Sequence, residues 1–296
     1  MLLDPARLTE VQGLEMKARL IVEGYLAGVH KSPYRGFSVE FAEHREYVPG
    51  DDLRYVDWKV FGKTDRYYLK QFDEETNFAC HLLVDTSESM DYRSDKAAVS
   101  KLEYARWTAA ALAYVITQQR DAVGLSTFDS RLHYALRPQS TTQQLRELCR
   151  ELEQTPAGGD SDIGAILQEF AERQVRRGVV VLISDFFDEI ETLERGLRHL
   201  SFRKHDVILV QVVDPAEASF PFQEPTLFQG LEGWGPRAVD PRGLKRAYLE
   251  EFERHLGRLR GLARELRFDY LLLPTDRPVG TSLAALFAQR QQRRGI

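Results

Sequence analysis

Polar side chains follow an apolar run in the stretch HLLVDTSESM, residues 81–90. Asp85 ends the run, and Ser87 and Ser89 follow it at alternate positions. Alternate residues of an extended segment point to one side, so a carboxylate and two hydroxyls can face the same point. Mg²⁺ takes oxygen ligands of this kind, with one or two carboxylates and several waters. The spacing favours a metal site, and a turn-forming Asp followed by helix-capping serines is the structural alternative.

Two more polar groups have the same character. The glycine loop GGDSDIG, residues 158–164, contains Asp160, Ser161 and Asp162. These residue types also make a good N-cap for the helix predicted after the loop. Asp185 ends a second apolar run, VLISD. Because the functional crevice of an open parallel sheet lies at the carboxyl ends of its strands, we expect all three groups to meet at one edge of a sheet.

Continuous apolar runs alternate with helical stretches from residue 78 onward. Runs that do not alternate with polar residues are typical of strands buried on both faces of a parallel sheet. Residues 132–136 follow the preceding strand after only three residues, so this strand must be an antiparallel partner at the edge. The pattern predicts an α/β fold with a doubly wound, mostly parallel sheet and one antiparallel edge strand. The predicted strands are 78–84, 122–128, 132–136, 178–184, 206–213 and 268–274, and the predicted helices are about 101–120, 141–154, 162–176, 190–200 and 242–266.

The first 77 residues differ from the rest of the chain. Apolar residues recur at helical spacing from about residue 6 to 27, which predicts an amphipathic helix outside the main body. The remainder, up to residue 77, is dense in aromatic residues and mixed charges, and short strands and turns suit it best. We therefore divide the chain into an N-terminal segment, 1–77, and an α/β domain, 78–296, with a proline-rich loop insertion at 214–241.

Composition narrows the class of protein. A hydrophobic share of 43% suits a globular core, and a net charge of -5 gives no general attraction to nucleic acid. Two cysteines, Cys80 and Cys149, are too few for a disulfide framework or a cysteine-rich zinc site. We find no signal peptide and no apolar run of 18 residues, and we expect a cytoplasmic protein without direct membrane insertion. The polar tail, residues 289–296, is expected to fray.

The three polar groups, in this order on an α/β backbone, resemble the von Willebrand factor type A (vWA) domain and its metal-ion-dependent adhesion site (MIDAS). The resemblance covers roughly residues 78–275 and implies a bound Mg²⁺, or Mn²⁺ or Ca²⁺ in its place. Ser161 stands where that family usually has a threonine, which leaves open whether Asp160 or Asp162 participates instead. The ligands implied, direct or through water, are Asp85, Ser87, Ser89, Ser161 and Asp185.

Residues 32–75 resemble the characteristic block of the bacterial DUF58 family, including the segment EYVPGDDLRYVDW. Members of that family look like partners of MoxR-type AAA+ ATPases in modules that assist the assembly or metal loading of other proteins. The block carries interleaved opposite charges, which suit a network of bidentate ion pairs. That network is either a structural clasp or a docking surface, and its members are Arg35, Arg45, Asp51, Asp52, Arg54, Asp57 and Trp58.

Together these features predict a non-enzymatic, metal-dependent interaction module. The resemblance implies two partners: a MoxR-type ATPase and a client protein that supplies a carboxylate to the metal. One alternative is a haloacid-dehalogenase-like phosphohydrolase with Asp85 as nucleophile and Asp185 and Asp188 on Mg²⁺. That class needs a second acid at the position of Ser87, whose hydroxyl is no general acid near neutral pH. Another alternative is a vWA-like scaffold without metal.

Histidines give no support to a serine hydrolase, because none lies in a nucleophile-elbow context. His81 falls inside a predicted strand and is expected in the core. His199 and His205 flank a turn between a helix and a strand, and we expect both to face solvent.

Overall fold

The computed structural model describes residues 4–26, 44–46, 68–70, 79–174, 177–228, 235 and 237–294. Its centre is a six-stranded sheet with the strand order β10-β7-β6-β3-β4-β5. Every neighbouring pair is parallel except β4 and β5, which run antiparallel at the edge. The doubly wound fold and its antiparallel edge strand are therefore confirmed. The strands are β3 (Ala79–Asp85), β4 (Ala122–Phe128), β5 (Leu132–Gln139), β6 (Val179–Ser184), β7 (Asp206–Val213) and β10 (Asp269–Pro274).

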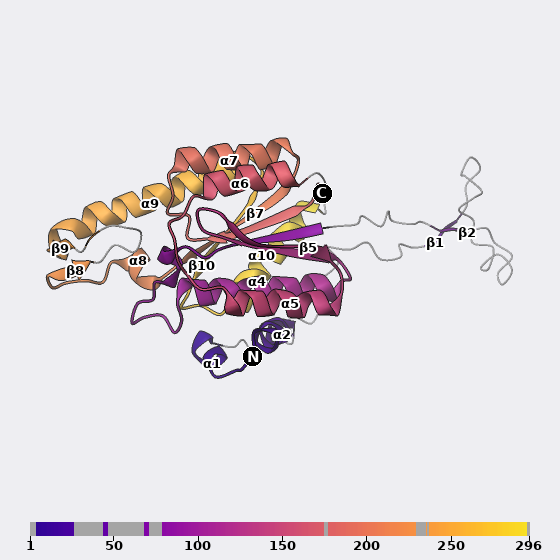
Figure 1. Ribbon diagram of the computed structural model, residues 1–296, viewed down its shortest axis with the longest axis horizontal. Helices are drawn as coiled ribbons and strands as arrows, with labels where there is room; N and C mark the ends of the chain where they lie inside the picture. The colour runs from indigo at the N-terminus through magenta and orange to yellow at the C-terminus, as the bar shows by residue number, and fades with distance from the viewer. Residues whose placement is uncertain are drawn as a thin grey trace.

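Helices cover both faces of the sheet (Figure 1). One hydrophobic cluster joins one face to α2, α4, α5 and α10, and a second joins the other face to α6, α7 and part of α9. The helices are α1 (Pro5–Thr9), α2 (Leu14–Leu26), α4 (Lys101–Gln118), α5 (Thr142–Gln154), α6 (Ile163–Arg173), α7 (Ile190–Phe202), α8 (Pro215–Ser219), α9 (Pro241–Glu265) and α10 (Val279–Arg294), with a 3-10 turn, η2, at Glu88–Asp91.

Strand β3 shows how one segment serves both faces. Cys80, Leu82 and Val84 belong to the cluster under α4, whereas Leu83 belongs to the cluster under α6 and α7. Every residue from Cys80 to Asp85 is buried, as the uninterrupted apolar run predicts. β3 is thus a central strand, and its last residue lies at the carboxyl edge of the sheet.

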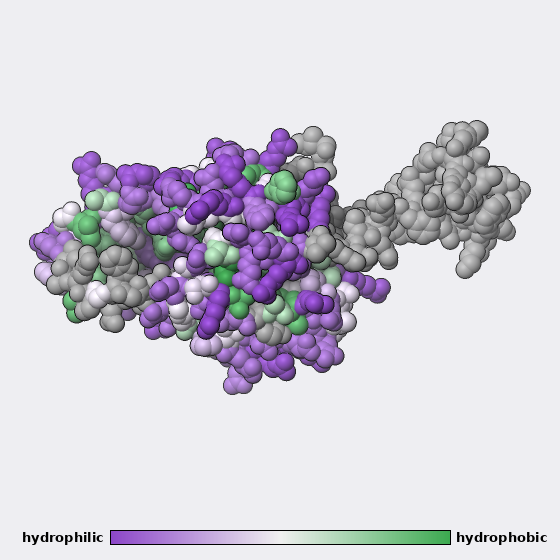
Figure 2. Space-filling view, turned by 45° about the horizontal axis from the view of Figure 1, so that its top comes forward, coloured by the Kyte–Doolittle hydropathy of each residue, from purple (hydrophilic) through white to green (hydrophobic). Residues whose placement is uncertain are grey.

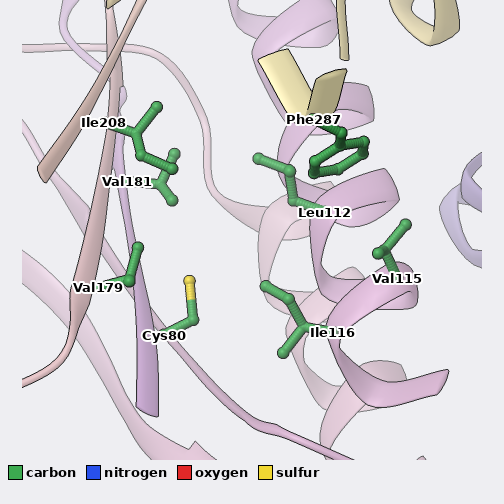
Figure 3. A pocket seen from close by; sticks show the side chains of 8 residues that line it. All are labelled: Cys80, Leu112, Val115, Ile116, Val179, Val181, Ile208 and Phe287. Atoms are coloured by element: carbon green, nitrogen blue, oxygen red, sulfur yellow. The ribbon is translucent and has the colours of Figure 1, made fainter. Parts of the chain in front are cut away.

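A small cavity of about 10 Å³ lies between the sheet and helix α4 (Figure 3). Aliphatic side chains of the sheet face Leu112 and Ile116 of α4, with Phe287 of α10 and the Cys80 thiol completing the lining. Burial raises the pKa of Cys80 to about 12, so the thiol stays protonated. A void of this size and apolarity is a packing gap and not a ligand site.

Four short strands form two further sheets of two strands each. β1 (His44–Glu46) pairs antiparallel with β2 (Tyr68–Lys70) inside the segment predicted to be β-rich. β8 (Thr226–Phe228) pairs antiparallel with β9 (Arg237–Val239). The predicted insertion at 214–241 thus contains α8 and this second strand pair. Three aromatic residues of the insertion, Phe220, Phe222 and Phe228, pack on one another.

Helix α2 corrects the prediction of an N-terminal helix outside the main body. Ala18 and Ile21 of α2 belong to the same hydrophobic cluster as α4, and Lys17 Nζ lies 3.3 Å from Glu103 Oε1 of α4. The Leu14 amide donates to Glu153 Oε1 of α5 (2.6 Å). The prediction was wrong because an amphipathic pattern shows that a helix has a partner, and not how far away that partner lies.

Helix α10 is absent from the sequence-based prediction. It continues to Arg294, so the expectation that the tail frays from residue 289 is wrong for residues 289–294. Val279, Leu283, Leu286 and Phe287 are buried at helical spacing. Arg290 is only 7% exposed, and its guanidinium pairs with carboxylates of β10 and β7. A charged residue in a polar tail gives no signal of such ion pairs, because both acids come from distant strands.

The surface in Figure 2 is mainly hydrophilic, with apolar residues scattered among charged ones. Among the residues whose structure is described, no helix is both long and apolar enough to cross a membrane.

Candidate metal site at the carboxyl edge of the sheet

Asp85 ends strand β3 and is completely buried. The Ser184 hydroxyl donates to its Oδ2 (2.6 Å), and the Ser87 amide donates to its Oδ1 (2.9 Å). Burial and the nearby carboxylate of Asp185 raise the pKa of Asp85 to about 7, against the lowering effect of these hydrogen bonds. A buried carboxylate with this balance is a strong candidate for a cation, because a cation relieves both the desolvation and the repulsion.

Ser87 and Ser89 follow on the connection between β3 and α4. Ser87 is fully buried, and its Oγ lies 3.1 Å from the Oγ of Ser89. The alternate spacing therefore brings the two hydroxyls together as predicted. Ser87 precedes η2 without a capping hydrogen bond from its side chain. The alternative reading of Ser87 as a helix cap gains no support, and its hydroxyl stays available to a ligand.

The glycine loop lies directly against this connection. The Glu88 amide donates to the Gly159 carbonyl (2.9 Å), and the Gly158 amide donates to the Thr86 carbonyl (2.9 Å). Gly159 has a φ of +77°, and a Cβ there would overlap Asp129 Oδ2. Only glycine fits at this position, since it needs both a left-handed backbone and the missing side chain.

Ser161 is the residue of the glycine loop that points to a ligand. Its Oγ is buried and has no hydrogen-bond partner among the described residues. By contrast, Asp160 and Asp162 are exposed, and Asp162 accepts a hydrogen bond from the Ala165 amide as the N-cap of α6. The helix-cap reading thus holds for Asp162, whereas the orphaned hydroxyl of Ser161 needs another explanation.

Asp185 follows strand β6 and is 2% exposed. Its Oδ2 lies 2.7 Å from the Nζ of Lys101, the first residue of α4, and its Oδ1 accepts from the Phe187 amide (3.2 Å). Lys101 Nζ also lies 2.6 Å from Glu217 Oε1 of α8. Burial lowers the pKa of Lys101, but the two carboxylates raise it by more, so the lysine is charged.

The sequence-based prediction did not include Lys101 or Glu217. A cation in the first turn of a helix opposes the helix macrodipole, and this is the one local signal that could have marked Lys101. Glu217 forms a capping box with Asp214 at the start of α8, a pattern visible as DPAE in the sequence. Asp188, named in the phosphohydrolase alternative, accepts from the Ile163 amide (2.9 Å) and thereby fixes the start of α6.

The residues present fit a hard divalent cation. Two buried carboxylates and three hydroxyls come from the ends of β3 and β6 and from the glycine loop. β3 and β6 are neighbours from which the chain winds in opposite directions, and ligands of open α/β sheets bind at such a switch point. Within the described part of the chain no three His, Cys, Asp or Glu side chains form a metal-binding group. A site built on two acids and serines is of a different kind, and Mg²⁺ accepts it.

Most of the predicted N-terminal charge network lies outside the described residues. Arg35, Asp51, Asp52, Arg54, Asp57 and Trp58 are all outside them. Arg45 lies in β1, where it pairs with Leu69 of β2. The network therefore stays a prediction.

Sequence comparison identifies the family. Residues 43–256 match the family described as "Protein of unknown function DUF58", which is more than half of the chain. The chain belongs to the DUF58 family. It is also 28% identical to two mycobacterial proteins, "Uncharacterized protein Rv1480" of Mycobacterium tuberculosis and "Uncharacterized protein Mb1516" of Mycobacterium bovis, over 98% of this chain and 91% of each relative. The DUF58 resemblance is thus confirmed.

Solved structures similar to this DUF58 protein have low sequence identity. One is the conserved hypothetical protein BatB from Bacteroides thetaiotaomicron, with a TM-score of 0.49 and 14% identity over 73% of this chain and 99% of BatB. Another is the SpRpn10 VWA domain, with a TM-score of 0.41 and 11% identity over 70% of this chain and 93% of that domain. The strand order and the antiparallel edge strand are what establish the fold class here.

Proposed function

We propose that this DUF58 protein is a non-enzymatic interaction module that binds Mg²⁺ at the carboxyl edge of its sheet and uses the metal to recognise a partner's carboxylate. The buried, unpartnered hydroxyl of Ser161 is the observation that carries the proposal. A buried polar atom without a partner costs free energy, and a metal or its bound water would satisfy it. The hydroxyl belongs to the loop that is hydrogen-bonded to the segment of Ser87 and Ser89.

Each residue has a distinct role in this proposal. Asp85, Ser87 and Ser89 hold the metal from one side, Ser161 from the glycine loop, and Asp185 through water because Lys101 already occupies its Oδ2. Ser184 orients Asp85 through its hydroxyl (2.6 Å). Mg²⁺ keeps several exchangeable waters when the protein supplies few charges, and an acidic side chain of a partner can replace one of them.

The proposed partners are a MoxR-type AAA+ ATPase and a client protein that supplies the carboxylate. Support comes from membership of the DUF58 family and from the resemblance described above. Mn²⁺ and Ca²⁺ are the other cations the oxygen ligands accept. The proposed location is the cytoplasm, where such an ATPase has its nucleotide.

Isothermal titration with MgCl₂ tests the metal, and capture of a purified MoxR-type ATPase tests the partner. The titration uses metal-free protein in chelator-free buffer, and capture is done with and without EDTA; both compare wild type with Asp85→Asn. The proposal expects saturable Mg²⁺ binding by wild type and binding on the order of 100-fold weaker by the variant. It expects capture by wild type in Mg²⁺, and no capture by the variant or in EDTA. Equal capture in all four conditions contradicts a metal-bridged interaction.

Lys101 favours a second candidate, a vWA-like scaffold that works without metal. The buried ammonium of Lys101 lies against Asp185, where it supplies a positive charge to an acidic cluster made of Asp85, Asp185 and Glu217. This candidate expects wild type to capture its partner in EDTA as well as in Mg²⁺, with no heat of Mg²⁺ binding. The phosphohydrolase alternative has no such support, because Ser87 stands where that chemistry needs an acid.

A further inference from the structure

Lys101 is the feature of the acidic cluster that the proposed metal site does not explain. Its side chain is 1% exposed, although lysine is almost never fully buried without partners. Nζ contacts Asp185 Oδ2 at 2.7 Å and Glu217 Oε1 at 2.6 Å. The rings of Phe187 and Tyr92 lie 5.2 and 5.9 Å from Nζ. The ammonium is thus enclosed by two carboxylates and two aromatic rings.

Glu217 fixes the other end of this contact to the backbone. Its Oε2 accepts from the Asp214 amide (2.8 Å), and Asp214 Oδ2 accepts from the Ser94 amide (2.9 Å). Ser94 lies on the connection between β3 and α4 that also carries Ser87 and Ser89. The ammonium therefore lies in a hydrogen-bonded frame that joins the ends of β6 and β7 to that connection.

We infer that Lys101 sets the charge of the metal site, so that the metal-loaded site attracts a carboxylate instead of repelling it. This rests on the proposed function. The carboxylates that contact Lys101 or belong to the proposed ligands, those of Asp85, Asp185 and Glu217, sum with the ammonium to a formal charge of −2; the Asp214 carboxylate, which accepts from the Ser94 amide, lies outside this set. A divalent cation brings the cluster to neutrality, and its open positions then accept an anion. Without the lysine, the loaded cluster carries −1 and opposes an acidic ligand.

The ligand class follows from this balance. A monocarboxylate, such as an Asp or Glu side chain of a partner, adds one negative charge to a neutral cluster. A phosphate group adds close to two and is less well balanced. Lys101 is thus a specificity-determining residue that need not touch the metal.

Two substitutions of opposite sign test the inference. Lys101→Met removes the positive charge and should tighten Mg²⁺ binding about tenfold, whereas Glu217→Gln removes a negative charge and should weaken it about tenfold. Glu224→Gln is the matched control, because it removes the same charge from a side chain that is 82% exposed. Mg²⁺ affinity is measured by isothermal titration on variants whose circular dichroism matches that of wild type.

A second measurement addresses the carboxylate. Sodium acetate is titrated into Mn²⁺-loaded protein, and water-proton relaxivity reports loss of metal-bound water. Acetate should lower the relaxivity of wild type and Glu217→Gln, and about tenfold more acetate should be needed for Lys101→Met. A preference for inorganic phosphate over acetate that exceeds the preference of free Mn²⁺ in the same buffer contradicts the ligand class.

The outcomes separate this inference from the proposed function. No saturable Mg²⁺ binding by wild type overturns the proposed function and the inference together. If Asp85→Asn greatly weakens Mg²⁺ binding, but Lys101→Met and Glu217→Gln each weaken it or leave it unchanged, the inference alone is overturned. A lysine with a purely structural role would lower Mg²⁺ affinity whichever partner of the ion pair is removed. If Lys101→Met does not fold, Glu217→Gln decides: unchanged or tighter Mg²⁺ binding contradicts the inference.

Discussion

The two ends of strand β3 bury a titratable group in different surroundings. Near the start, His81 packs edge-on to the Phe170 ring at 5.3 Å, and burial with the neighbouring His205 lowers its pKa to about 4. At the other end, burial and Asp185 raise the pKa of Asp85 to about 7, while a hydroxyl and an amide donate to it. Both ends favour the neutral group, but among the described residues the hydroxyls and the lysine lie at the carboxyl end. Burial alone therefore does not make a site, because the site also needs polar partners that converge.

The burial of His205 contradicts the expectation that this histidine faces solvent. His205 is 5% exposed and does not face solvent, and neither of its ring nitrogens has a hydrogen-bond partner among the described residues. Its ring centroid lies 6.3 Å from that of Phe170, so two histidines flank one phenylalanine. Burial lowers the pKa of His205 as well. The prediction failed because a turn position says little about which way the side chain packs.

Removing a charge should be most costly at the carboxyl end. Lys101→Met leaves Asp185 and Glu217 buried without their shared cation, and breaking a buried ion pair costs about 3–5 kcal/mol of unfolding free energy. Urea denaturation in EDTA measures this loss. Arg246→Met, at a side chain 91% exposed, is the control and should change stability by less than about 0.5 kcal/mol. A loss below about 1 kcal/mol for Lys101→Met would show that the pair is not buried in solution.

Asp85→Asn should separate metal binding from folding. The amide keeps the shape of the carboxylate and removes its repulsion from Asp185, so stability in EDTA at pH 8 should equal or exceed that of wild type. Mg²⁺ affinity should fall on the order of 100-fold, since the most buried charged ligand is gone. Thermal melts with and without MgCl₂ give both quantities. His81→Leu on the same strand should keep the full rise in melting temperature with Mg²⁺. Loss of that rise would contradict the claim that metal binds at the carboxyl end of β3 and not at the histidine end.

The histidine end predicts a loss of stability in acid. The pKa of His81 is lower in the folded protein than its ordinary value of 6.5, so below about pH 6.5 the unfolded chain takes up a proton that the folded protein does not. The free energy of unfolding is therefore highest above about pH 6.5 and falls as the pH drops towards 4. The loss amounts to about 3 kcal/mol at pH 4. Urea denaturation of wild type and His81→Leu from pH 8 to 4 separates the pH dependence of stability due to His81 from that due to the carboxylates. Parallel pH curves for the two proteins would rule out the buried, neutral His81.

Ser161→Ala tests the smallest of the expected effects. Removing the unpartnered hydroxyl should leave stability in EDTA unchanged or slightly higher, and should weaken Mg²⁺ binding about tenfold. Asp160→Asn, one residue earlier and exposed, is the comparison, and isothermal titration measures both. If Asp160→Asn weakens Mg²⁺ more than Ser161→Ala does, the middle ligand is the aspartate.

Local patterns predicted most of the sheet. The strands at 122–128 and 206–213 begin and end as predicted, since continuous apolar runs between turn residues mark buried strands directly. Helix α10 was missed although Val279, Leu283 and Leu286 recur at helical spacing, because the polar end of that segment hides the pattern. The two helices α1 and α2 replace one predicted helix, with Gly13 at a φ of +79° before the second.

By itself the sequence determined where the strands end, because adjacent residues specify both a buried strand and the turn that follows it. The strand ends in turn place Asp85, Ser87, Ser89 and Asp185. Only the tertiary structure decided that Lys101 reaches Asp185, 84 residues away, and Glu217, 116 residues away. It also showed that Ser161, and not the exposed Asp160 or Asp162, has a buried polar atom without a hydrogen-bond partner among the described residues. The physical reason is that apolar periodicity is local, whereas a buried charge depends on the distant partners that the fold brings within about 3 Å.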